Sequence, residues 1–260
     1  MFGPLLLTLD TVLSLVFLLP IKDDRGRYRS FPYVTVGLVL LNTIIHVFVY
    51  YMLPLGEDAW SKGGLMWQMM LVPADVLAGE GLGALSVITA AFLHASWSHL
   101  IGNMLIFFFF ARKLEDVLGP VKFALLYLVC VFVAGIGSVL GWTALPVTQG
   151  RTPSLGASGA IMGIVAAYLF LYHEQRILTL ILLGIIPIPL RMPAWVFILY
   201  TMTRDILGGW LEQEFQAYGY LYSLVDSFAH LGGIVAGLTC LFLFLPSGML
   251  HYRHRSDRGA

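Results

Sequence analysis

The sequence predicts an all-α polytopic membrane protein, with a six-helix core and an additional N-terminal apolar segment. Of the 260 residues, 58% are hydrophobic and 12% are charged, against about 45–50% and about 25% in soluble domains. The mean hydropathy is +0.83. Residues 34–53, 123–145 and 155–172 contain no Asp, Glu, Lys or Arg. Each of these runs has about the ~20 residues that cross a bilayer core.

The remaining composition points to one membrane domain that fills the chain, with the lipid bilayer around it. The formal net charge is zero. The sequence has no basic block of the kind that binds nucleic acid, and no long polar linker that would leave room for a soluble domain. Cys130 and Cys240 both lie in apolar runs, where thiols behave as small hydrophobic groups. They indicate neither a disulfide nor a metal cluster.

The positions of the core helices follow from the apolar runs between polar breaks. They are expected at residues 34–53, 85–111, 123–145, 155–172, 193–211 and 221–245. Two shorter apolar segments are harder to assign as membrane spans. Residues 4–20, with Asp10 near their middle, either span the membrane or lie at its surface. Residues 177–190 contain Pro187 and Pro189 and are too short and broken to span, so we place them at the inner interface, entering the fifth helix.

Lysine and arginine set the orientation, because short cytoplasmic loops carry an excess of both. With alternating helices, twelve of the fifteen fall on one side of the membrane, and only Lys62 and Arg151 fall on the other. Arg204, inside the fifth helix, is the remaining one. The first helix therefore starts in the cytoplasm and the C-terminal tail ends there. The second, fourth and sixth helices run inward.

Polar side chains inside the spans are energetically costly and mark candidate functional positions. They are His46, His94, His99, Asn103, Ser158, Arg204, Asp205, Asp226 and His230. At ~1.5 Å per residue from the inner ends of their helices, Ser158 lies at ~21 Å and His230 at ~22 Å. Both can therefore occupy one level in the outer half of the membrane. His99 and Asn103 are four residues apart and share a helix face.

Small residues accompany this serine and this histidine. Gly159 and Gly163 on the fourth helix, and Gly233 and Gly237 on the sixth, have the spacing that lets two helix backbones approach closely. Taken alone, these glycines indicate only helix packing. A serine and a histidine beside these glycines, at one depth in the membrane, indicate a catalytic pair. A serine hydroxyl is a weak nucleophile and needs a general base within hydrogen-bond reach, which is usually histidine.

At these residues the sequence resembles the rhomboid family of intramembrane serine proteases. The matching motifs, in chain order, are His94-x4-His99-x3-Asn103, Gly156-Ala157-Ser158-Gly159 and Ala229-His230-Leu231-Gly232-Gly233-x3-Gly237. They stand on alternate helices. The resemblance extends from residue 20 to the end of the last helix, and leaves the N-terminal apolar piece and the tail uncovered.

The resemblance implies a catalytic dyad with Ser158 as the nucleophile and His230 as its base. It also implies an oxyanion hole formed by His99, Asn103 and the backbone N–H of Ser158. Donors at a helix N-terminus suit this task, because they favour a developing negative charge. The same motifs imply a supporting set, which consists of His94, Gly156, Gly159, Met162, Gly233 and Gly237. We expect His94 to hold the outer loop through hydrogen bonds.

Two features depart from the family pattern. Four residues after the serine the family commonly has an aromatic residue that packs on the catalytic histidine. This chain has Met162, whose thioether can pack there less rigidly. The outer loop at residues 54–84 lacks the Trp-Arg pair that some bacterial members carry.

Two further interpretations concern the neighbouring polar groups. A metal site is disfavoured, because His94 and His99 lie about 140° apart around a helix with no Glu between them, unlike the i,i+4 histidines of zinc proteases. Asp226, four residues before His230, either orients the imidazole as in a triad or caps or hydrates the helix entrance. The second role is favoured, since the family works as a Ser-His dyad. His46 is expected to be a packed polar residue.

The resemblance implies an intramembrane serine endopeptidase that cuts single-pass transmembrane proteins in or near their membrane-spanning segment, without a metal or other cofactor. The alternative is a catalytically inactive rhomboid-like protein that binds membrane segments, although such relatives typically lack the serine or the histidine. We expect an N-terminal apolar segment and basic cytoplasmic stretch at residues 1–30, the membrane protease domain at 31–246 and a cytoplasmic tail at 247–260. A bacterial cytoplasmic (inner) membrane is the expected location.

Overall fold

The computed structural model describes residues 16–23, 29–53, 57–144, 150–183, 186–203 and 226–245, and most of them are helical. The longer helices are α2 (Tyr33–Val47), α6 (Trp97–Leu118), α7 (Pro120–Ala144), α8 (Ser158–Tyr172) and α10 (Ser227–Phe244). The shorter ones are η1 (Phe48–Met52), η2 (Glu57–Trp60), α3 (Leu65–Met69), α4 (Pro73–Ala78), η3 (Gly83–Leu85), α5 (Ser86–Thr89) and η4 (Ala90–Phe92). The strands are β1 (Val16–Asp23), β2 (Arg176–Leu183) and β3 (Ile186–Pro193).

This arrangement confirms the predicted fold class. Within the described part of the chain, three helices are long and apolar enough to cross a membrane: Tyr33–Met52, Pro120–Ala144 and Ser227–Phe244. The described residues also include a bent pair that can make one span, and shorter apolar helices at Ser158–Tyr172 and Ala194–Thr203. The predicted continuation of the fifth helix to residue 211, with Arg204 and Asp205, lies outside the described residues, as do residues 4–15 and the tail at 247–260.

The second predicted helix is not one continuous helix, which corrects the expected range of 85–111. The segment Gly83–Phe92 makes an angle of 82° with α6, which begins only at Trp97. The break has a local cause, because the Ser96 hydroxyl accepts a hydrogen bond from the His99 N–H at 3.2 Å and so caps the new helix. His94 therefore lies in the break and not on α6. The comparison with the histidines of zinc proteases had placed His94 and His99 on one helix.

Helix α6 also continues past the predicted end, because its charged last turns have partners. Lys113 forms a buried ion pair with Asp23 of β1 at 3.1 Å. The Glu115 carboxylate accepts hydrogen bonds from the backbone N–H groups of Val34 and Thr35 at 2.9 and 2.8 Å. These N–H groups belong to the first turn of α2 and have no partner within that helix. The pairings fix both β1 and the start of α2 against α6.

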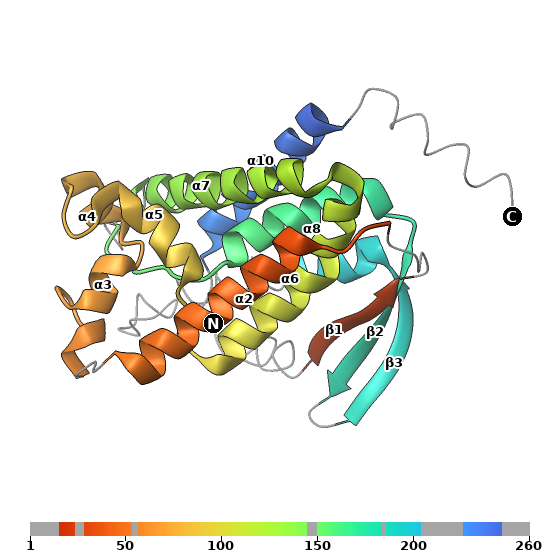
Figure 1. The fold of residues 1–260 in the computed structure, drawn as a ribbon, viewed down its shortest axis with the longest axis horizontal. Helices are drawn as coiled ribbons and strands as arrows, with labels where there is room; N and C mark the ends of the chain where they lie inside the picture. The colour runs from red at the N-terminus through yellow and green to blue at the C-terminus, as the bar shows by residue number, and fades with distance from the viewer. Residues whose placement is uncertain are drawn as a thin grey trace, which may run out of the picture.

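A three-stranded antiparallel sheet, in the order β1-β2-β3, was not anticipated. Residues 177–190 were expected to lead into the fifth helix. Residues 177–183 of this segment instead belong to β2 and residues 186–190 to β3, and the following helix begins at Ala194. Pro187 and Pro189 exclude a helix here but suit an edge strand. Figure 1 shows the strands lying to one side of the helices, near the ends of α6 and α8.

The glycine spacings correctly predicted a close helix crossing. A Cβ atom added to Gly233 would overlap the carbonyl oxygen of Gly159, and one added to Gly237 would overlap that of Gly163. The backbones of α8 and α10 are therefore in direct contact. On its other side α10 packs against α7, and Figure 1 shows α7 running along the bundle beside α8 and α10.

We expect Gly233→Ala to destabilise the protein by about 1–3 kcal/mol, since an added methyl group must push α10 away from α8. The measurement is the free energy of unfolding in mixed detergent micelles. Gly102→Ala is the matched control, because a Cβ at Gly102 on α6 meets no atom within 4 Å, and alanine favours a helix by about 0.5–1 kcal/mol. Equal stability of the two variants would contradict the assigned crossing.

Candidate active site

Ser158 is the first residue of α8, and the backbone just before it is in an unusual conformation. Gly156 has a φ of +116°, in the left-handed region that other residues rarely adopt. Its N–H donates to the carbonyl oxygen of Ala90 at 2.8 Å, which fixes the loop against the bent segment before α6. Ala157 then precedes the helix with αR dihedrals. The serine is therefore presented at a helix N-terminus, where backbone N–H groups remain available.

The structure brings Ser158 and His230 together as predicted from their depths. The His230 Nε2 atom lies 2.9 Å from the Ser158 Oγ atom, a hydrogen-bond distance. His230 is in the first turns of α10 and its side chain is buried. The two residues are 72 positions apart in the sequence, so their meeting depends on the close contact between α8 and α10. This spacing is the geometry that a serine nucleophile and its general base require.

His99 and Asn103 of α6 lie against the loop that leads to Ser158. A Cβ atom placed on Gly156 would be 2.8 Å from His99 Nε2 and 3.5 Å from Asn103 Nδ2. Both side chains therefore border Gly156, two residues before the serine. Among the described residues, the buried Asn103 Nδ2 has no hydrogen-bond acceptor. An unused buried donor beside the serine is what a site for a developing oxyanion needs.

The predicted supporting residues fall around this centre. Gly159 and Gly233 form the crossing described above, and Met162 is buried one turn beyond Ser158 on α8. His94 is also buried, but its ring nitrogens have no hydrogen-bond partner among the described residues. Its ring instead packs edge-on against His99, with ring centroids 5.1 Å apart. Among the described residues, His94 thus makes ring contacts, and its expected hydrogen bonds to the loop at residues 54–84 stay a prediction.

His46 of α2 extends this packing, as expected of a packed polar residue. Its ring centroid lies 4.7 Å from that of Trp97 and 6.5 Å from that of His94. The described residues contain no group of three or more His, Cys, Asp and Glu side chains placed to hold a metal ion.

Asp226 caps α10, the role favoured over a triad. One carboxylate oxygen accepts from the Ala229 N–H at 2.9 Å and from the Trp142 indole N–H at 3.0 Å. The other accepts from the Ser138 hydroxyl. Ser138 and Trp142 belong to α7, more than 80 residues away in the sequence. The sequence analysis did not predict either residue, because no motif or spacing near Ser138 or Trp142 indicates a contact with Asp226.

The resemblance implies peptide-bond cleavage, and we expect Asp226→Asn to keep that activity within about tenfold of the unchanged protein, which is ~1.4 kcal/mol in transition-state stabilisation. Asparagine keeps an oxygen that can cap the helix. Asp226→Ala removes the cap, and should lower the free energy of unfolding by about 0.5–2 kcal/mol. The measurements are kcat and unfolding in micelles. A kcat loss beyond about a hundredfold in folded Asp226→Asn would show that the carboxylate works as a third catalytic group.

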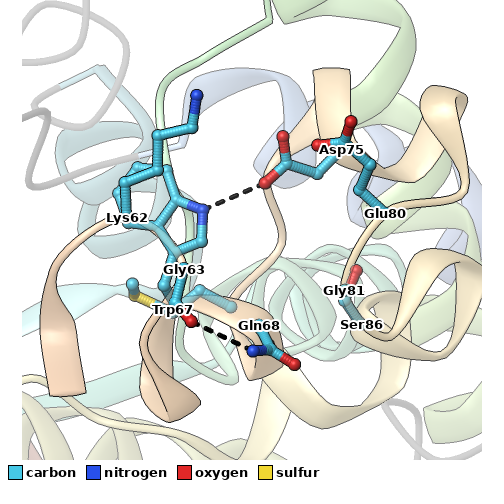
Figure 2. A pocket seen from close by; sticks show the side chains of 9 residues that line it. Lys62, Gly63, Trp67, Gln68, Asp75, Glu80, Gly81 and Ser86 are labelled. Carbon is cyan, nitrogen blue, oxygen red and sulfur yellow. Dashed lines mark hydrogen bonds between the residues drawn. The ribbon is translucent and has the colours of Figure 1, made fainter.

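The segment between η2 and α5 contains a separate pocket of about 560 Å³. Its lining includes Lys62, Trp67, Gln68, Asp75 and Glu80 but neither Ser158 nor His230. Figure 2 shows the Trp67 indole N–H donating to Asp75, at 3.0 Å, and the Gln68 amide donating to the Gly63 carbonyl oxygen, at 3.1 Å. The loop at residues 54–84 lacks the Trp-Arg pair of some bacterial members. A hydrogen bond between Trp67 and Asp75 joins α3 to α4 there.

The fold and the site define a polytopic membrane protein with a serine-histidine pair held by two closely packed helices. A sequence profile of the rhomboid domain matches residues 83–247, which is more than half of the chain. The chain therefore belongs to the rhomboid family.

Individual relatives agree with this assignment. Rhomboid protein 1, mitochondrial, of Saccharomyces cerevisiae is 29% identical over 199 residues, covering 76% of this chain and 50% of the yeast protein. RHOMBOID-like protein 6, mitochondrial, of Arabidopsis thaliana is 29% identical over 210 residues, covering 80% and 57%. Rhomboid-like protein 11, chloroplastic, of the same plant is 29% identical over 160 residues, covering 60% and 51%.

Two facts follow from these relatives. This chain spans about half the length of each of them. Their names place all three in mitochondria or chloroplasts, so they give no support to the expected bacterial inner membrane.

Proposed function

We propose that this protein is an intramembrane serine endopeptidase that works with a Ser158–His230 dyad. The observation that carries the proposal is the 2.9 Å separation of His230 Nε2 and Ser158 Oγ. A packed membrane bundle has no structural need for a partly buried serine paired with a buried histidine, since polar groups in spans are costly. Ser158 and His230 lie where the backbones of α8 and α10 are in contact. Nucleophilic catalysis explains this position, because it requires the two side chains within hydrogen-bond reach.

The reaction follows from the roles of these groups. His230 Nε2 takes the proton of Ser158 Oγ as the oxygen attacks the carbonyl carbon of the scissile peptide bond. The resulting oxyanion is stabilised by the Ser158 N–H, His99 and Asn103. The C–N bond then breaks and His230 gives its proton to the leaving amine, which leaves an acyl group on Ser158. Water, deprotonated by His230, hydrolyses this ester and restores the hydroxyl.

The substrates proposed are single-pass transmembrane proteins, cleaved in or near their membrane-spanning segment. In a helix the carbonyl groups are hydrogen-bonded and shielded, so the segment must become extended where it meets Ser158. Residues 31–246 are the proposed protease domain, residues 1–30 precede it and residues 247–260 are a cytoplasmic tail. In the proposed topology, the excess of Lys and Arg at the inner ends orients Ser158 toward the outer half of the bilayer.

The test is cleavage of a purified single-pass substrate in liposomes that contain the purified full-length chain. We expect fragments from cleavage in or near the spanning segment, and undiminished cleavage in EDTA, because the proposed chemistry uses no metal. Inhibition by EDTA that zinc reverses would contradict the serine mechanism. Binding of the segment without any cleavage would favour the inactive rhomboid-like protein instead.

A further inference from the structure

The three-stranded sheet has one face that is only partly covered by the helices. Side chains alternate between the two faces of a strand, so Ile177, Thr179 and Met192 share a face with Ile186, Ile188 and Leu190. The first three are buried against the bundle. The other three, toward the far end of β3, are 62%, 42% and 46% exposed. The same face thus begins in the core and continues as an uncovered apolar surface.

The opposite face of the sheet carries positive charge. Lys22 of β1 pairs with Leu178 of β2, which pairs with Arg191 of β3. This row places two cations about two strand spacings apart, roughly 10 Å, on either side of a leucine. Both cations are exposed, and together with Asp23 and Leu178 they line a cavity of about 260 Å³. Of these lining residues, the acidic one, Asp23, is paired with Lys113 at 3.1 Å.

The outer edge of β3 is poor in hydrogen-bond donors. Pro187, Pro189 and Pro193 have the same parity along the strand, so their nitrogens point toward one edge. The antiparallel ladder with β2 uses the N–H groups of the other residues, so the prolines face outward. An edge without N–H groups cannot readily add another strand. The same edge also carries fewer donors that would be costly to remove from water.

The place of the sheet at one end of the bundle favours lipid as the partner that covers its apolar face. The sheet is fixed by the Lys113–Asp23 ion pair to the end of α6, where the charged residues of the bundle gather. Figure 1 shows the strands extending from this end to one side of the helices. The spanning helices of the same bundle also expose apolar side chains, such as Leu125 and Leu128 of α7, and in a bilayer lipid covers such side chains.

We propose that this sheet is an amphipathic element of the inner membrane surface that binds anionic lipid. Ile186, Ile188 and Leu190 enter the boundary between acyl chains and headgroups, as the apolar face of an interfacial helix does. Lys22 and Arg191 lie at headgroup level and bind the phosphate of an anionic phospholipid. The proposal does not depend on protease activity.

The first arm of the test locates the apolar face. Ile188→Cys carries an environment-sensitive fluorophore, and the full-length protein is placed in bilayers of equal parts phosphatidylcholine and phosphatidylglycerol. The native thiols Cys130 and Cys240 are buried. We expect strong quenching by nitroxides on lipid acyl chains and weak quenching by aqueous iodide, with Arg176→Cys on the cationic face showing the reverse. Leu190→Cys serves if the first variant fails to fold.

Other outcomes of this arm overturn the proposal. Quenching of the Ile188 position by iodide alone would place the face in water. Quenching by neither agent would show that protein, such as a second copy of the chain, covers it.

The second arm tests the charges, by native mass spectrometry of phosphatidylglycerol binding in neutral detergent. We expect Lys22→Gln with Arg191→Gln to weaken binding by about 30-fold, or ~2 kcal/mol, given about 1 kcal/mol for each cation. Lys62→Gln with Arg151→Gln is the control, since it removes equal charge at the expected outer side. Equal loss from both pairs, or no loss from the first, would overturn the headgroup site.

Discussion

Ser158→Ala and His230→Ala are each expected to abolish cleavage of a single-pass substrate in liposomes. The residues act as one unit, so removing either loses on the order of 10⁴- to 10⁶-fold in kcat, which leaves no detectable product. Without His230, the proton of Ser158 has no acceptor at the 2.9 Å distance. Without Ser158, no other nucleophile stands at the start of α8.

The controls for this prediction are changes of the same residue types elsewhere. His173→Ala removes a half-exposed histidine that lies 3.5 Å from Glu174 beyond the end of α8, and Ser98→Ala removes an exposed hydroxyl on α6. Both should cleave at the unchanged rate. Substantial cleavage by folded Ser158→Ala or His230→Ala would refute the dyad.

The second large effect concerns the oxyanion site. His99→Ala and Asn103→Ala are each expected to lower kcat by about 10²–10³-fold, the cost of one such donor, with little change in KM. The reason is their position against Gly156, two residues before the nucleophile. Rates at saturating substrate separate kcat from KM, and Ser98→Ala on the same helix is the matched control. A rise in KM with unchanged kcat would show that these side chains only bind substrate.

Sequence alone was sufficient for the parts of the site that follow from helix geometry. Depth along the helices placed Ser158 and His230 at one level, and the glycine spacings predicted the crossing that brings them into contact. His99 and Asn103 were paired from their i,i+4 spacing. Each of these inferences needs only a regular helix and a known end.

The features that sequence did not predict depend on local caps and long-range contacts. Residues 93–96 (Leu-His-Ala-Ser) contain no proline or glycine, so no helix breaker marked the point where Ser96 caps the start of α6. The sheet depends on β1 meeting β2 about 160 residues later, and its strands lack a clear polar alternation. The side-chain partners of Asp226 are on α7, and no spacing rule connects Trp142 with a residue 84 positions away.

The most direct test of the central claim is the residue that a fluorophosphonate probe modifies in the purified protein. Such a probe reacts with a serine whose hydroxyl is activated by a base. We predict a single adduct, mapped by peptide mass spectrometry to Ser158, which is lost in His230→Ala and retained in His173→Ala. An adduct on another serine, or cleavage of substrate by a protein that the probe does not label, would contradict Ser158 as the nucleophile.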